Sequence, residues 1–98
     1  MIYHITHKEK WDAANNEGFY DTSSLVSEGF IHCSTFPQIS GVLERYYKNE
    51  TGLVLLHIDE ALLTSNLRFE LSPSVNEMFP HIFGPINIDA VLEVISIK

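Results

Sequence analysis

The chain has 98 residues, 45% of them apolar, which is the size and composition of one globular domain with a buried core. Its net charge of −7 and its six Lys and Arg residues leave no basic patch for nucleic acid or an anionic membrane, so we expect neither as a partner. Cys33 is the only cysteine, and there is no secretory leader or apolar run of membrane-spanning length, so we expect a cytoplasmic protein without disulfides.

The N-terminal segment predicts a strand followed by a helix. Residues 2–6 alternate in polarity, and this alternation places His4 and Thr6 on the same face of the strand. Thr6 and Glu9 have the spacing of a capping box, which predicts that a helix begins here and continues to Glu17.

The next segment predicts a loop, a second strand and a second helix. Residues 19–29 are rich in Ser, Thr, Asp and Gly, and a loop of this length indicates a functional role. Residues 30–34 predict a strand. Thr35 and Gln38 form another capping box, from which a helix continues to about Lys48.

The second half of the chain is dense in strand signals. Residues 53–58 are apolar on both faces, as in a central strand. Residues 67–71, 79–83 and 90–97 predict further strands, with a loop over 72–78. This order predicts a single α+β domain with a mixed or antiparallel sheet and two main helices, and it disfavours a doubly wound fold.

Three histidines lie at the centres of short apolar runs, namely His4, His32 and His81. Burying an imidazole costs free energy, and although a single buried histidine is more often a satisfied core residue, three in similar settings favour one shared polar cleft. His7 and His57 are interpreted as structural or surface residues. The histidine and cysteine spacings do not match zinc-binding motifs, so we expect no metal.

Arg68 and Glu70 lie two residues apart on one predicted strand and therefore share a face. They form either a surface ion pair of little energetic value or the cationic and acidic members of the cleft. The alternate residues of the same strand are predicted to point inward; they are Leu67, Phe69 and Leu71.

Hydroxyl and aromatic residues complete the set of candidates. No nucleophile-elbow motif is present, so Ser24 and Ser34 are interpreted as ligand-binding hydroxyls, and a simple turn role for Ser34 stays equally open. Phe79 and Phe83 share the predicted face of His81 and could stack on a flat ring of a ligand, although core packing is the alternative.

Several motifs spread over the whole chain resemble the domain-of-unknown-function 952 family, which is small, mostly bacterial and without an established activity. They are residues 2–6, 28–34, 67–70 and 79–85. The fold of that family resembles the fold of ADP-ribosyltransferases. The resemblance therefore implies a split β-sheet with a nicotinamide-type cleft between its halves, and NAD as the possible ligand.

The resemblance also implies roles for individual residues. His4 matches the position that holds the ribose of NAD, and His32 is the counterpart of a residue that packs near nicotinamide. The position where the ADP-ribosyltransferase group often has a glutamate carries His81 in this chain, and Glu70 lies one strand earlier. This departure argues against ordinary glutamate-assisted transfer.

Two hypotheses from different classes follow. The first is an ADP-ribosyltransferase-like enzyme that breaks or moves the glycosidic bond of NAD or of an ADP-ribosylated small molecule; the second is a non-catalytic module that binds a small metabolite or nucleotide. A protein-interaction domain is a third interpretation, and the oligomeric state stays open. For the enzyme, the catalytic candidates are His81, His32 and Glu70, and the ligand-binding candidates are His4, Ser24, Ser34, Arg68, Phe79 and Phe83.

Overall fold

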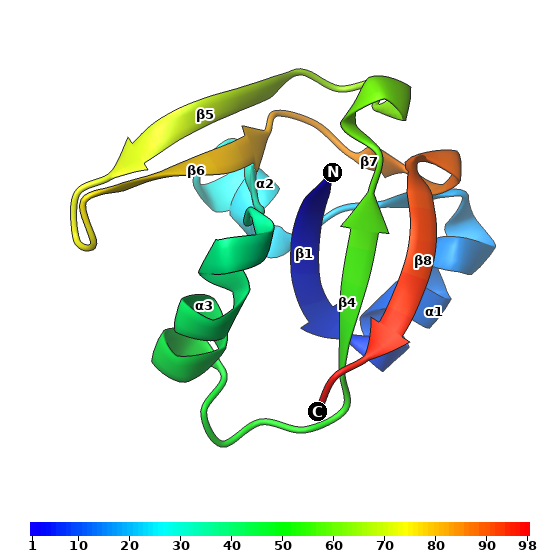
Figure 1. Cartoon of the computed structure of the whole chain (residues 1–98). Helices are drawn as coiled ribbons and strands as arrows, with labels where there is room; N and C mark the ends of the chain where they lie inside the picture. Colours follow the sequence, from blue (N-terminus) through cyan, green and yellow to red (C-terminus); the bar gives the residue numbers. More distant parts are fainter.

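The computed structural model describes all residues, 1–98, and its first sheet is the centre of the fold. This sheet has the strand order β1 (Ile2–His7), β4 (Leu53–Ile58) and β8 (Val91–Ser96), with both pairs antiparallel (Figure 1). The central strand β4 is buried on both faces, as its apolar sequence predicts. The predicted strands over residues 2–6, 53–58 and 90–97 are therefore confirmed with small shifts at their ends.

A second three-stranded antiparallel sheet has the order β3 (Ile31–His32), β6 (Glu77–Ile82) and β5 (Leu67–Ser72). A short two-stranded sheet pairs β2 (Phe19–Tyr20) with β7 (Ile86–Asn87). All strand pairs are antiparallel, so the structure is an α+β fold with antiparallel sheets and few helices.

The two three-stranded sheets are connected at one β-bridge. Tyr3 N–H donates to Ser34 O at 2.8 Å, and Ser34 N–H donates to Tyr3 O at 2.7 Å. This bridge sets the edge of β1 beside the residues that follow β3. Side chains of β1, β3 and β6 can therefore face one common space.

Helices cover the two faces of the first sheet. α1 (Lys8–Glu17) packs Trp11 and Ala14 into the larger core cluster, together with alternate β4 residues. α3 (Ile39–Tyr46) packs on the smaller cluster, formed with the other β4 residues. A short helix, α2 (Ser23–Ser27), precedes β3. No helix is both long and apolar enough to cross a bilayer.

The capping boxes predicted from the sequence have opposite outcomes. At the second helix the prediction is confirmed, because Thr35 N–H donates to the Gln38 side chain at 2.9 Å and a 3₁₀ turn, Phe36–Gln38, leads into α3. At the first helix the prediction is wrong. His7 is the N-cap residue without a side-chain cap, and the Thr6 hydroxyl contacts Tyr20 instead.

Two other local predictions need correction. Residues 19–29 are not a continuous loop, since they contain β2 and α2. On β5, Phe69 and Leu71 are exposed although alternation predicts them to point inward. The hairpin of β5 and β6 extends beyond the core in Figure 1, and neither core cluster includes Phe69 or Leu71. Its connection is also shorter than predicted, because β6 already begins at Glu77.

Candidate functional site

A cleft of about 1070 Å³ lies between the two sheet halves. Residues of β1, β2, β3 and β6 line it together with parts of α1, α2 and α3. Three of the nine candidates from the sequence do not line it, namely Arg68, Glu70 and Phe83. The six candidates that the structure brings together in its wall are His4, Ser24, His32, Ser34, Phe79 and His81.

His4 is the centre of a closed hydrogen-bond network at the base of the cleft. Its Nδ1 lies 2.6 Å from the carbonyl oxygen of His32, and its Nε2 lies 2.9 Å from the Tyr20 hydroxyl. A carbonyl oxygen only accepts, so Nδ1 carries the proton, and Nε2 of the neutral ring accepts from Tyr20. The Tyr20 oxygen also lies 2.8 Å from Thr6 Oγ1, but the single proton of the Tyr20 hydroxyl is already donated to His4 Nε2. The Thr6 hydroxyl therefore supplies the proton of that third contact.

Burial keeps this network uncharged. Desolvation lowers the pKa of His4 to about 4 and outweighs the opposing effect of the hydrogen bond to His32. Desolvation likewise raises the pKa of Tyr20 to about 12. Both groups are neutral near pH 7, and neither nitrogen of His4 is free to bind a ligand. The position that the family resemblance relates to ribose binding is thus occupied by an internal cross-link.

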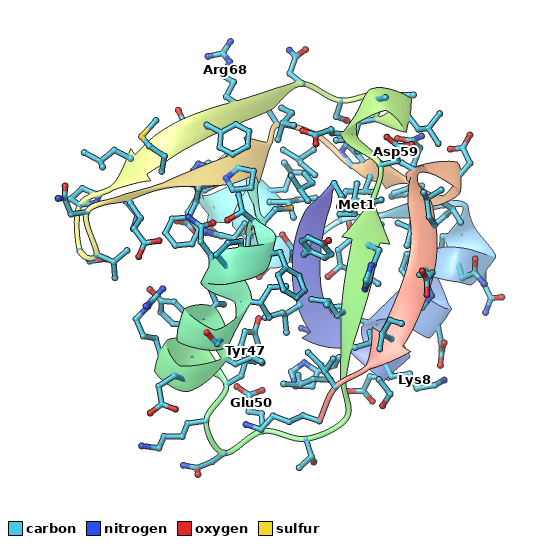
Figure 2. All side chains as sticks on the ribbon, in the orientation of Figure 1. Met1, Lys8, Tyr47, Glu50, Asp59 and Arg68 are labelled. Atoms are coloured by element: carbon cyan, nitrogen blue, oxygen red, sulfur yellow. The ribbon has the colours of Figure 1, made fainter.

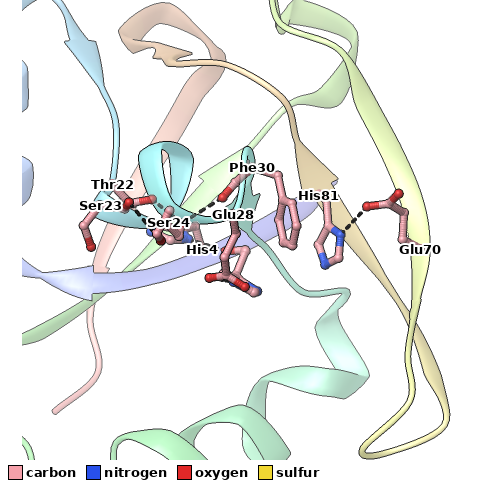
Figure 3. Close-up of polar contacts among 10 residues, drawn as sticks. His4, Thr22, Ser23, Ser24, Glu28, Phe30, Glu70 and His81 are labelled. Atoms are coloured by element: carbon pink, nitrogen blue, oxygen red, sulfur yellow. Dashed lines mark hydrogen bonds and ion pairs between the residues drawn. The ribbon is translucent and has the colours of Figure 1, made fainter.

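His81 has a different environment on the wall formed by β6. Its Nδ1 lies 2.8 Å from Glu70 Oε1, as Figure 3 shows, and its ring stacks on Phe30 with centroids 3.9 Å apart and planes inclined by 16°. The carboxylate accepts from Nδ1–H, which leaves Nε2 unprotonated in the neutral ring. Nε2 has no intramolecular hydrogen-bond partner. Because every buried side-chain polar atom of the protein has such a partner, Nε2 is not buried, and it is accessible from the cleft.

His32 lies opposite His81 in the register of β3 and β6, and their ring centroids are 5.5 Å apart. His32 Nε2 is 3.0 Å from Glu28 Oε2, four residues earlier. The site therefore contains two neighbouring imidazoles, each in contact with its own carboxylate. They differ in solvent access, since the His32 side chain is 57% exposed and that of His81 is 9% exposed.

Arg68 and Phe83 lie at the rim of the second sheet, outside the cleft. Arg68 shares the face of Glu70 as predicted, but it is exposed, and its guanidinium carbon lies 5.4 Å from the centroid of the Phe83 ring. Figure 2 shows the Arg68 side chain pointing away from the body of the molecule. The cations that do line the cleft are Lys10 and Arg45.

The two candidate serines have different hydrogen-bonding states. Ser24 Oγ donates to the carbonyl oxygen of Phe30 at 2.8 Å and lies 2.6 Å from Thr22 Oγ1, so it stabilises the turn before β3. Ser34 is a buried residue, and its side-chain hydroxyl has no intramolecular hydrogen-bond partner. Because no buried side-chain polar atom is left unpaired, the Ser34 hydroxyl opens to the cleft and is available to a ligand.

Cys33 also borders the cleft, but its chemistry is that of a core residue. Desolvation raises the pKa of its thiol, so the nucleophilic thiolate is disfavoured. No group of three or more His, Cys, Asp or Glu side chains is arranged to hold a metal ion.

The sequence analysis did not identify Tyr20 and Glu28 as site residues. Tyr20 belongs to the two-residue strand β2, inside a segment interpreted as a loop, and no local pattern marks it. Glu28 could have been identified, because it precedes His32 by four residues and contacts it in the structure. The role of Phe30 as the stacking partner of His81 depends on tertiary contacts that periodicity does not encode.

The fold and the cleft define a small α+β protein with antiparallel sheets and a histidine-lined cavity. The model of the family described as "Protein of unknown function (DUF952)" matches residues 5–94, so the chain belongs to this family. The family predicted from the sequence motifs is thereby confirmed.

Solved structures of one bacterial protein, CC0527 from Caulobacter crescentus, are similar to this chain. Its crystal structure has 28% sequence identity and a TM-score of 0.89, covering 99% of this chain and 85% of that one. Its solution NMR structure also has 28% identity, with a TM-score of 0.85 and coverage of 99% and 84%. No curated protein matches the chain.

Proposed function

We propose that the chain is an ADP-ribosyltransferase-like enzyme that binds NAD or an ADP-ribosylated small molecule in the cleft and breaks or transfers its glycosidic bond. The observation that carries this proposal is the Glu70–His81 hydrogen bond, which leaves one nitrogen of His81 free at the cleft wall. A carboxylate-bound histidine with one free nitrogen is a suitable general base.

The proposed reaction with NAD and water needs only one base. His81 Nε2 takes a proton from water as the water oxygen bonds to the anomeric carbon of the ribose. The bond from that carbon to the nicotinamide nitrogen breaks, and its electron pair leaves with nicotinamide. The cationic ring departs as a neutral molecule, so the leaving group needs no acid, and the products are ADP-ribose, nicotinamide and a proton. In a transfer reaction, an acceptor hydroxyl replaces water.

The positive charge that develops on the ribose needs a nearby anion or dipole. Glu28 lines the cleft beside His32 and supports this role, while Glu70 acts through His81. The free hydroxyl of Ser34 is placed to bind a ribose oxygen. Among the aromatic residues, Phe79 lines the cleft and offers a surface for a flat ring.

The phosphates would lie toward the other end of the cleft. Arg45 is in the last turn of α3, two residues before Tyr47, whose hydroxyl approaches the carbonyl oxygen of Ile5 at 3.5 Å. This contact brings the end of α3 to the middle of β1. Lys10 and Arg45, rather than Arg68, are therefore the proposed contacts of a pyrophosphate.

The test begins with binding. We would record amide chemical shifts of labelled protein while adding NAD, ADP-ribose and nicotinamide in turn. Saturable shifts at His32, Ser34 and His81 are the expected result, and no shifts at about millimolar ligand would refute the NAD proposal.

Turnover is tested by measuring nicotinamide release by chromatography. His81→Ala is expected to lower the rate by about 10²–10⁴-fold while ligand-induced shifts persist. His57→Ala is the matched control, because His57 stacks edge-on with Tyr3 and does not line the cleft. Equal activity in both variants would exclude His81 as the base.

A non-catalytic binding module is the second candidate, and one observation favours it. Carboxylates outnumber cations in the cleft wall, which favours a neutral or cationic metabolite over a dinucleotide. Saturable binding of such a ligand, with no turnover of NAD or ADP-ribosylated compounds, would support the module. The carboxylates are Glu17, Asp21, Glu28 and Glu50, against the cations Lys10 and Arg45.

A further inference from the structure

β3 and β6 present two neighbouring imidazoles on one wall of the cleft. His32 and His81 lie directly opposite each other in the register of the two strands, and their ring centroids are 5.5 Å apart. Phe30 lies against both rings, with centroid distances of 4.8 Å to His32 and 3.9 Å to His81. The two imidazoles therefore face the cleft as one pair.

Each imidazole has one bonded and one free nitrogen. Glu70 accepts from Nδ1–H of His81 and leaves Nε2 of that ring free. At His32 the order is reversed, since Glu28 Oε2 lies 3.0 Å from Nε2 and Nδ1 has no intramolecular hydrogen-bond partner. A substrate that lies across the two strands therefore meets one free nitrogen from each ring.

The two rings differ in how well their surroundings stabilise a positive charge. The His32 side chain is 57% exposed, so water and the carboxylate of Glu28 both stabilise its doubly protonated form. His81 also contacts a carboxylate, but its side chain is only 9% exposed and has little hydration. His32 is therefore the better proton donor of the pair, and His81 is the better proton acceptor.

A proton donor has no role in the reaction with NAD, because nicotinamide leaves as a neutral molecule. A charged His32 would also repel the positively charged nicotinamide ring of bound NAD. A glycosidic bond to oxygen makes the opposite demand. An alkoxide is a poor leaving group until it is protonated, so cleavage of such a bond uses a general acid as well as a base.

We propose that the cleft hydrolyses ADP-ribose that is linked through its anomeric oxygen to an alcohol, and that His32 is the general acid of this reaction. This inference rests on the proposed function and narrows its substrate class to O-linked ADP-ribosides. His81 keeps the role of the base. Glu28 acts through His32, as Glu70 acts through His81.

The proposed step uses one proton transfer at each ring. His81 Nε2 takes a proton from water as the water oxygen bonds to the anomeric carbon. The bond from that carbon to the alcohol oxygen breaks, its electron pair stays on the oxygen, and this oxygen takes the Nδ1 proton of His32. The products are ADP-ribose and the free alcohol. His81 then releases its proton to solvent and His32 takes one up, which restores the starting state.

Three substrates test this proposal: NAD and two ADP-ribosides in both anomeric forms, one with propanol and one with para-nitrophenol as the leaving group. We expect a kcat/KM for the propyl riboside at least about tenfold above that for NAD. His32→Ala should slow hydrolysis of the propyl riboside by about 10²–10⁴-fold. It should slow hydrolysis of the nitrophenyl riboside by less than about tenfold, because nitrophenolate leaves without a proton. His81→Ala should slow both.

Chemical rescue separates an acid from a structural residue. Imidazole added to His32→Ala should restore part of the activity on the propyl riboside, because the vacated position is open to solvent. A purely structural His32 would not be replaced in this way. Circular dichroism of the variant reports whether the fold is unchanged.

Each contrary result has its own meaning. Equal losses on the two ribosides in His32→Ala would overturn the assignment of the acid. Faster release of nicotinamide from NAD than of propanol from its riboside would overturn the substrate class but leave the proposed enzyme in place. No turnover of any of the three substrates would refute the proposed function itself, and this inference with it.

Discussion

His4 and His81 lie in matching sequence settings and are equally buried, each with 7% of its surface exposed, yet their environments differ. Both ring nitrogens of His4 are bonded within the protein. Only one nitrogen of His81 is bonded, to Glu70. A saturated imidazole connects elements, whereas one with a free nitrogen can bind a ligand or move a proton. Burial alone does not distinguish these two roles, but the count of free nitrogens does.

The two histidines also connect different parts of the molecule. Through the carbonyl oxygen of His32 and the hydroxyl of Tyr20, His4 ties β1 to β3 and β2. His81 connects only the neighbouring strands β5 and β6 and stacks on Phe30. Replacing His4 should therefore lower the global stability of the fold, whereas replacing His81 should impair function.

The strongest test of this comparison is His4→Phe. A phenyl ring fills a similar volume, but it deprives the carbonyl oxygen of His32 of its donor and the hydroxyl of Tyr20 of its contact with Nε2, so that Tyr20 keeps only the contact with Thr6. We expect the free energy of unfolding at pH 7 to fall by about 4 kcal/mol, from roughly 2 kcal/mol for each deprived group. Urea denaturation measures this change.

The matched control is His57→Phe, on a residue whose ring nitrogens make no hydrogen bond and whose ring contacts Tyr3 edge-on. The control should change the free energy of unfolding by less than about 1 kcal/mol. Similar losses in the two variants would mean that the network around His4 is not a special source of stability.

The next largest effect is the pH dependence that His4 imposes. Its pKa of about 4 in the folded chain lies below the ordinary value of 6.5, so the unfolded chain binds more protons between these two values. Stability should therefore decrease as the pH falls from about 6.5 to about 4, with a contribution from His4 of about 3 kcal/mol. His4→Phe removes this contribution, so its unfolding free energy should vary less with pH than that of the wild type. Identical pH profiles would contradict the neutral, buried state of His4.

Tyr20→Phe tests the outer part of the same network and should have a smaller effect. It removes the hydroxyl that lies 2.9 Å from His4 Nε2 and 2.8 Å from Thr6 Oγ1, while the bond from His4 to His32 persists. The expected loss of stability is about 1–2 kcal/mol by urea denaturation. A loss as large as that of His4→Phe would show that the phenol, and not the imidazole, is the main cross-link.

Some features of the fold and of the candidate site could be predicted from the sequence. Patterns within a strand depend on local residues. Period-two alternation therefore placed Arg68 and Glu70 on one face, as their register with β6 shows, and the continuous apolar run identified the central strand β4. The capping box at Thr35 was predicted for the same reason, since its spacing is local. These features needed no knowledge of the partner elements.

The other features of the site could not be predicted, because they depend on contacts between segments that are distant in the sequence. The register that places His32 opposite His81 is set by the pairing of β3 with β6. Tyr20 was missed because β2 has two residues and exists through its pairing with β7. Arg68 was a candidate for the cleft because alternation reports a face of the strand, but not the direction of a long side chain, which points away from the body of the molecule in Figure 2. Whether an imidazole nitrogen is free is likewise a tertiary property.

The smallest effect on stability is expected for Glu70→Gln, and this variant sharpens the contrast between the two histidines. Glu70 is 42% exposed, and a partly exposed ion pair contributes little, so the free energy of unfolding should change by less than about 1 kcal/mol. The amide oxygen can still accept from Nδ1–H of His81, but the negative charge is lost. The ¹⁵N shifts of the His81 ring should therefore move, because a neutral amide oxygen is a weaker acceptor for the Nδ1 proton than a carboxylate, whereas the shifts of His4 should not. Glu93→Gln, on the exposed strand β8, is the charge-matched control. If His4 responded as strongly as His81, the two sites would be coupled, and the separation of a structural histidine from a functional one would fail.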